Sequence, residues 1–99
     1  MITEIAQIRI DPARAPDFES AVAEAAKVFE VADGCRGMRL ERGIEDPAKY
    51  RLVVQWDSVE HHMVSFRNSA GFQTWRALAG PFFIDTPVVD HSECVGAYF

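Results

Sequence analysis

The order in which strand-like and helix-like hydrophobic patterns succeed one another is the feature that most constrains the fold of this chain. Strand-like segments occupy residues 2–10, 35–42, 50–56 and about 88–96. Helix-like segments, with apolar residues three and four positions apart, follow Pro16, Asp57 and Ser69. This order is the split βαβ, or ferredoxin-like, pattern. We therefore predict a single α+β domain over residues 1–99, with four antiparallel strands in one sheet and both helices on one face.

The strand patterns also predict a sheet face that no helix covers. Within residues 50–56 the side chains alternate, so that one face holds Tyr50, Leu52, Val54 and Trp56. The face toward the helices also receives Glu4, a carboxylate among the apolar residues of the first strand. The opposite face carries Ile5 and Val53, which need protection from water. We therefore expect a homodimer, in which a second subunit covers that face.

Local signals predict where the helices begin and end. Pro16 suits a first helical turn, and Gly34 can end that helix in the left-handed conformation. Asp57, with Glu60 three residues later, has the form of a capping box and predicts a short helix. Ser69 predicts the cap of a further helix that ends at Gly80. The side chains expected to point inward from the short helix are Val59, Met63 and Phe66.

Composition and charge exclude several classes of function. Hydrophobic residues make up 48% and charged residues 25%, which is typical of a folded globular protein. The net charge of -5 disfavours nucleic acid and acidic membrane surfaces as partners. No segment has the length of a membrane span, and the first residues lack a signal-peptide pattern, so we expect a cytoplasmic protein.

The sequence gives no motif for a metal or a nucleotide. CxxC, HExxH, GxGxxG and P-loop patterns are all missing, and we expect neither a metal site nor a cofactor. His61 and His62 are adjacent and project about 100° apart on a helix, so they are unsuited to a shared metal. Cys35 and Cys94 are expected to be reduced thiols at opposite edges of the sheet, too far apart for a disulfide bond.

Several segments together resemble the antibiotic biosynthesis monooxygenase (ABM) domain family. They are residues 50–58, ending in Trp56-Asp57-Ser58, then Glu60-His61-His62, Phe66-Arg67-Asn68-Ser69, Phe72-Gln73-Thr74-Trp75-Arg76 and Pro87-Val88-Val89. The resemblance covers nearly the whole chain in element order and is sharpest from Tyr50 to Val89. It implies a dimeric α+β barrel, in which two ferredoxin-like sheets pack face to face.

The resemblance leaves more than one activity open. Similar proteins include cofactor-independent quinol and anthrone oxygenases, haem-degrading enzymes and proteins without a known reaction. The haem-degrading branch uses an Asn, a Trp and a His where this chain has Ala6, Phe66 and Arg76, so haem degradation is disfavoured. Trp56 matches the Trp that ends the third strand in the aromatic oxygenases. The resemblance thus implies a monooxygenase without a cofactor, acting on a quinol-like or phenol-like molecule.

Two other functions fit the same scaffold. One is a non-catalytic dimeric protein that binds a small molecule or acts in a stress response. The other is haem binding without the usual residues. Oxygen uptake with quinols distinguishes the first from an oxygenase, and a spectroscopic haem titration tests the second.

Oxygenation without a cofactor requires a dry aromatic pocket, a base and a donor that stabilises negative charge. We expect the pocket between the sheet and the helices, although the same aromatic residues at helical spacing also suit an ordinary core. His62 is the leading candidate base because imidazole titrates near neutral pH, and Glu4 is a second candidate because burial would raise its pKa. Arg67 and Arg76 are candidates to bind a phenolate or a carboxylate, and His91 is expected to be structural. The expected walls of the pocket are Glu4, Trp56, Met63, Phe66, Phe72, Trp75, Phe82 and Phe83.

Overall fold

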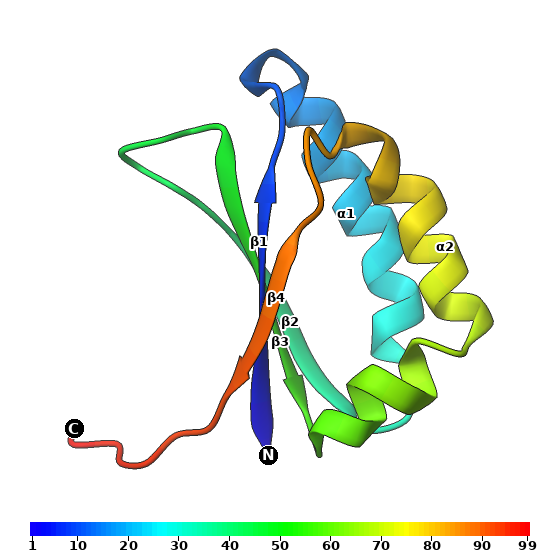
Figure 1. Ribbon diagram of the computed structural model, residues 1–99, viewed down its shortest axis with the longest axis vertical. Helices are drawn as coiled ribbons and strands as arrows, with labels where there is room; N and C mark the ends of the chain where they lie inside the picture. Colours follow the sequence, from blue (N-terminus) through cyan, green and yellow to red (C-terminus); the bar gives the residue numbers. More distant parts are fainter.

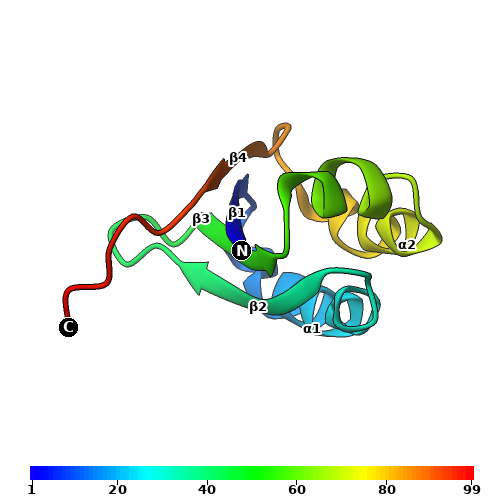
Figure 2. The ribbon, with the colours of Figure 1, turned by 90° about the horizontal axis from the view of Figure 1, so that it is seen from below.

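The computed structural model describes residues 1–99 and confirms the predicted ferredoxin-like fold (Figure 1). Three antiparallel pairings join the four strands in the order β2-β3-β1-β4. Both long helices lie on one side of this sheet, and its other side faces away from them (Figure 2). The elements are β1 (Ile2–Arg9), α1 (Ala15–Glu30), β2 (Cys35–Arg42), β3 (Lys49–Trp56), α2 (Ala70–Ala79) and β4 (Val88–Ser92), with short helical turns η1 (Pro12–Arg14), η2 (His61–Phe66) and η3 (Gly80–Phe82).

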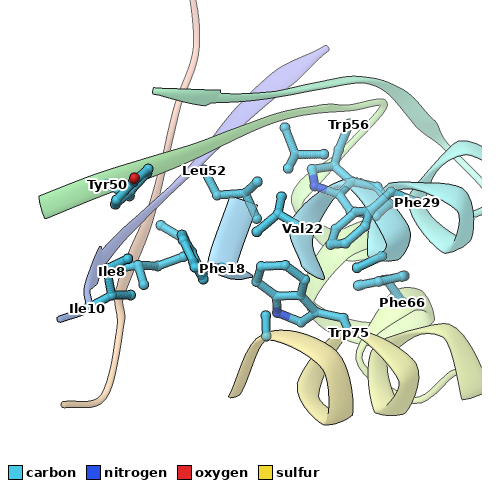
Figure 3. Close-up of a cluster of buried hydrophobic side chains, with 14 residues drawn as sticks. Ile8, Ile10, Phe18, Val22, Phe29, Tyr50, Leu52, Trp56, Phe66 and Trp75 are labelled. Carbon is cyan, nitrogen blue, oxygen red and sulfur yellow. The ribbon is translucent and has the colours of Figure 1, made fainter. Parts of the chain in front are cut away.

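The core fills the space between the sheet and the helices (Figure 3). Phe29 of α1 contacts the aromatic residues of three other elements, because its ring lies 4.7 Å from Phe66, 5.5 Å from Trp75 and 6.4 Å from Trp56, measured between centroids. Trp56, which ends β3, is fully buried. The alternation predicted for residues 50–56 is confirmed, since Tyr50, Leu52, Val54 and Trp56 all face the helices.

β4 is shorter than the predicted strand, which extended to about Gly96. Its last pairing joins Ser92 to Thr3, and β1 itself begins only one residue earlier, at Ile2. Beyond Ser92 there is no neighbouring strand to accept backbone hydrogen bonds, so the strand ends there. The following residues lead away from the domain, and Val95 and Tyr98 are exposed (Figure 1).

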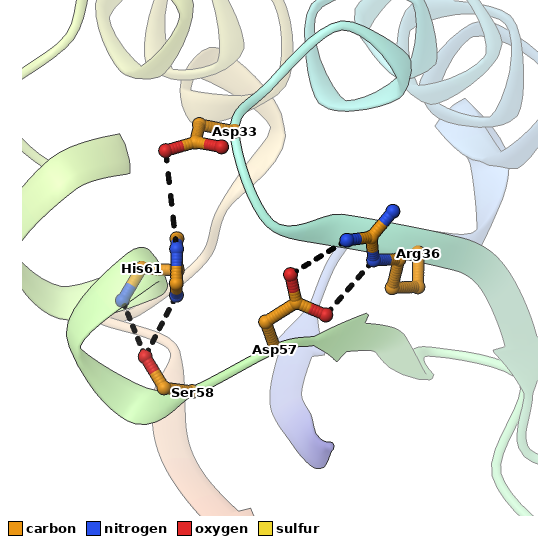
Figure 4. A network of polar contacts seen from close by, with 5 residues as sticks. All are labelled: Asp33, Arg36, Asp57, Ser58 and His61. Carbon is orange, nitrogen blue, oxygen red and sulfur yellow. Dashed lines mark hydrogen bonds and ion pairs between the residues drawn. The ribbon is translucent and has the colours of Figure 1, made fainter.

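The turn from β3 into η2 is held by polar contacts that differ from the predicted capping box (Figure 4). Asp57 does not cap the helix, because both of its carboxylate oxygens accept hydrogen bonds from Arg36 on β2, at 2.8 Å each. Ser58 takes the capping role, since its Oγ accepts a hydrogen bond from the backbone N–H of His61 at 3.2 Å. The same Oγ lies 2.7 Å from Nδ1 of His61, whose Nε2 is 3.8 Å from Asp33. These contacts fix the start of η2.

The wide turn of η2 explains why the predicted inward residues of the short helix are partly wrong. η2 is a π-helix, in which backbone hydrogen bonds span five residues, as from the N–H of Arg67 to the carbonyl oxygen of His62. This geometry brings His62 and Phe66 to the buried side. Met63 is 38% exposed and Val59 is 42% exposed, so neither points inward as predicted.

Candidate functional site

A cavity of about 560 Å³ lies between the β1–β4 side of the sheet and α2. It forms because α2 packs against α1 and stands off the sheet. Its walls come from β1, η2, α2 and the loop that precedes β4, and they include the predicted residues Glu4, Phe66, Phe72, Trp75 and Phe83. A largely apolar, concave site with a few polar groups is the usual form of a small-molecule site.

A buried polar cluster forms the floor of this cavity. Glu4 and His62 are 4% and 3% exposed and both line the cavity. Oε1 of Glu4 accepts a hydrogen bond from Nε1–H of Trp56 at 2.9 Å and lies 3.3 Å from Nε2 of His62. The imidazole of His62 stacks on the indole of Trp56 with ring centroids 5.4 Å apart and planes inclined by 19°. Trp56 therefore supports the floor from beneath and does not line the cavity as predicted.

His91 extends this cluster toward the surface. Nδ1 of His62 lies 2.9 Å from Nε2 of His91, which is half-buried. The sheet register explains the contact, because His91 of β4 is paired directly with Glu4 of β1, so both side chains project on the same face. The sequence analysis expected only a structural role for His91. Its spacing of two residues from Val89 could have indicated its place in this cluster, because residues two apart on a strand share a face.

Burial shifts the pKa values of the two central groups in opposite directions. Desolvation raises the pKa of Glu4 to about 7, although the Trp56 hydrogen bond and the positive charge of Arg67 act against this rise. Desolvation, with the charges of His91 and Arg67, lowers the pKa of His62 to about 4. At neutral pH His62 is thus an uncharged imidazole, while the carboxyl group of Glu4 is divided between its two forms.

One oxygen of Glu4 remains available to a ligand. Both contacts of Glu4 use Oε1, so Oε2 has no partner within the chain. Every fully buried side-chain nitrogen or oxygen has a hydrogen-bond partner, so Oε2 is not fully buried. It is therefore open to the cavity that Glu4 lines. The arrangement can accept a proton from a bound molecule and pass it along a chain of hydrogen-bonding groups.

The remaining predicted site residues divide into two groups. Arg67 and Arg76 line the cavity, and both guanidinium groups lie near the ring of Phe72. Met63 is turned outward by the π-helical geometry of η2 and does not line the cavity. Phe82 also lies outside it, because its ring packs against Phe18, 5.8 Å away between centroids.

No group of three or more His, Cys, Asp or Glu side chains is arranged to hold a metal ion. In the Glu4, His62 and His91 cluster, the two nitrogens of His62 face Glu4 and His91 separately rather than one common point. None of the helices combines the length and the apolar character that crossing a membrane requires.

The fold defines this chain as a ferredoxin-like α+β protein with a cavity beside its sheet, and the family follows from its sequence. The model of the family "Antibiotic biosynthesis monooxygenase" matches residues 1–78, and the chain belongs to that family. A crystal structure of a Bordetella bronchiseptica protein of this family is 50% identical and gives a TM-score of 0.92, over 95% of this chain and 96% of that chain.

Two further proteins are similar to this chain at lower sequence identity. The uncharacterized Bacillus subtilis protein YczJ is 33% identical over 95 residues, which cover 96% of this chain and all of YczJ (100%). SnoaB from Streptomyces nogalater, a cofactor-independent oxygenase, is 17% identical and gives a TM-score of 0.79, over 98% of this chain and 95% of that chain. At that identity the likeness to SnoaB concerns the fold alone.

Proposed function

We propose that this protein is a cofactor-independent monooxygenase that acts on an aromatic, quinol-like or phenol-like molecule bound in the cavity. The observation that carries the proposal is the buried Glu4–His62–His91 chain, which meets an aromatic cavity at Glu4. Membership of the monooxygenase family and the fold shared with SnoaB support it.

The reaction can be written for a phenol whose para carbon bears hydrogen. Oε2 of Glu4 takes the phenolic proton, and the phenolate then gives one electron to dioxygen. The resulting superoxide and phenoxyl radical combine at the ring carbon, and the peroxide takes up the proton. Loss of the C–H proton and cleavage of the O–O bond release water and leave a carbonyl group. One oxygen atom of dioxygen is retained in the quinone product, and the other leaves in the water.

Glu4 suits the first step better than His62, which was the leading candidate base from the sequence. A base acts most effectively when its pKa lies near the working pH, and the pKa of Glu4 is about 7 whereas that of His62 is about 4. His62 lies between Glu4 and the half-buried His91, so it is placed to relay the proton toward solvent. The hydrogen bond from Trp56 holds the carboxyl group in position.

Oxygen uptake with a panel of quinols and phenols tests this function, with isotopically labelled dioxygen to follow the retained atom. Glu4→Gln and His62→Gln should each lower the rate by roughly 10²–10⁴-fold, the range for a lost acid–base group. Glu24→Gln is a matched control, because Glu24 is an exposed residue of α1 that is paired with Lys27 outside the cavity. Wild-type rates in both cavity variants would refute the proton-transfer roles. Binding without oxygen uptake across the panel would instead favour a non-catalytic binding protein.

We further propose that the protein forms a homodimer through the sheet face opposite the helices. That face carries the half-buried Ile5 and the 61% exposed Val88 among polar residues, and no helix covers it. Val53 lies on the same face but is only 4% exposed within its own chain, so it does not need a partner's cover as the sequence predicted. The exposed apolar residues that follow β4, Val95 and Tyr98, lack a packing surface within their own chain. Light scattering at micromolar concentration should give the mass of a dimer, with an interface of about 2,000 Å² or more. A stable monomer mass would refute this assembly.

A further inference from the structure

Two arginines at the cavity have no carboxylate partner in a chain whose net charge is -5. The side chains of Arg67 and Arg76 are exposed and form neither an ion pair nor a hydrogen bond within the chain. Five of the ten Lys and Arg side chains form ion pairs with nearby carboxylates, namely Arg9, Lys27, Arg36, Arg39 and Arg42. Of the five without an ion pair, only Arg67 and Arg76 line the cavity. The two free guanidinium groups that line one cavity are therefore available to an anion from outside the protein.

Both guanidinium groups lie near the ring of Phe72 at the cavity, although they come from different elements. Arg67 follows η2, and Arg76 lies in the last turn of α2. Their central carbons are 5.5 Å and 6.0 Å from the centroid of the Phe72 ring, which also lines the cavity. An arginine beside an apolar wall binds a planar carboxylate through two parallel hydrogen bonds, and its charge is less screened there than in open solvent.

The remaining charged groups of the cavity limit where an anion can lie. Glu4 is at the buried floor, and the exposed Asp85 lies in the loop before β4. Both carboxyl groups disfavour a second negative charge beside them. The wall at Phe72 is the part of the cavity that carries positive charge, and the floor is the part that accepts a proton.

We propose that the natural ligand is an anionic aromatic molecule, an aryl carboxylate that also bears a phenolic hydroxyl group. Its carboxylate binds Arg67 and Arg76, its ring occupies the apolar space beside Phe66 and Trp75, and its hydroxyl group points to Glu4. This inference rests on the proposed function, because it names the class of substrate for the same cavity.

Calorimetry with two matched probes tests the charge preference without any turnover. The probes are 6-hydroxy-2-naphthoate and its uncharged amide, which differ in charge and hardly in size. We expect the carboxylate to bind the wild type about tenfold or more tightly than the amide, as a charge-assisted contact predicts. The double variant Arg67→Gln, Arg76→Gln should lose this preference while it still binds the amide. Arg14→Gln is the control, because Arg14 is an exposed arginine beside the ring of Phe82, forms no ion pair and does not line the cavity.

The outcomes separate this inference from the proposed function. Equal binding of the two probes by the wild type, or a carboxylate preference that survives in the double variant, would overturn the anionic substrate class and leave the cavity assignment standing. Failure of both probes to bind would overturn the substrate class and the cavity assignment together. A preference that is lost in the double variant and kept in Arg14→Gln supports the inference, and unchanged melting temperatures exclude misfolding as its cause.

Discussion

Replacement of Glu4 by glutamine should change how the stability of this protein depends on pH. The pKa of Glu4 rises on folding from 4.5 to about 7, mainly because burial disfavours the charged carboxylate. Between these two values the folded state keeps a proton that the unfolded chain has lost. The stabilisation is therefore complete below about pH 4.5 and is lost as the pH rises to about 7. At about 1.36 kcal/mol for each pH unit, the loss amounts to roughly 3 kcal/mol.

His62 contributes with the opposite sign over much of the same range. Its pKa falls on folding from 6.5 to about 4, so between these pH values the unfolded chain binds a proton that the folded state does not bind. The stabilisation from His62 is complete above about pH 6.5 and is lost as the pH falls toward 4, again by roughly 3 kcal/mol. The contributions of Glu4 and His62 to the pH dependence of stability largely cancel in the wild type. When one of the two residues is replaced, the contribution of the other should become measurable.

Urea denaturation followed by tryptophan fluorescence, from about pH 4 to about pH 8, measures these free energies of unfolding. Glutamine retains an oxygen that can accept the hydrogen bond from Trp56, so Glu4→Gln removes the titration with little change in shape. As the pH rises through this range, the free energy of unfolding of Glu4→Gln should increase by roughly 3 kcal/mol relative to that of the wild type. The free energy of unfolding of His62→Gln should decrease by a similar amount relative to the wild type. A difference between Glu4→Gln and the wild type that stays constant over this pH range would refute the assignment of a raised pKa to Glu4.

Three further predictions concern packing, backbone conformation and thiols. Trp75→Ala should lower the free energy of unfolding by about 3–5 kcal/mol, measured by urea denaturation, because a buried aromatic ring leaves a large void; a loss below about 1 kcal/mol would contradict the packing argument. Gly34→Ala should cost about 2 kcal/mol or more, seen as a lower melting temperature, because Gly34 has φ 79° and an added Cβ would collide with the ring of His61. An unchanged melting temperature would show that this loop can relax. Cys35 and Cys94 are both free, and two thiols should react with a chromogenic reagent in denaturant without prior reduction; fewer than two would reveal oxidation.

The sequence by itself determined the elements and their order. The alternation of Tyr50, Leu52, Val54 and Trp56 has a period of two, which only a strand can use to bury one side. Ser69 caps α2 as predicted, because its Oγ accepts a hydrogen bond from the N–H of Phe72 three residues later. Each of these signals acts between residues that are close in the chain, so no knowledge of the remaining structure is needed to interpret it.

The sequence also placed Glu4 on the helix-facing side of the sheet and His62 beside Phe66, and the structure confirms both positions. It gave no indication that these two side chains meet, since they are separated by most of the chain. Their 3.3 Å contact depends on the register of β1 against β3 and on the turn that leads from Trp56 into η2. A register is set by packing between distant segments, which a local pattern does not record.

Tertiary structure alone decided which of the predicted residues meet at the candidate site and which further residue joins them. His91 joins it because Ser92 is paired with Thr3, which places His91 opposite Glu4. Met63 leaves it because the π-helical turn of η2 rotates that side chain toward solvent, although an α-helical pattern had placed it inward. The cavity itself exists because α2 rests on α1 and stands off the sheet, a distance set by the volumes of side chains that come from every part of the chain.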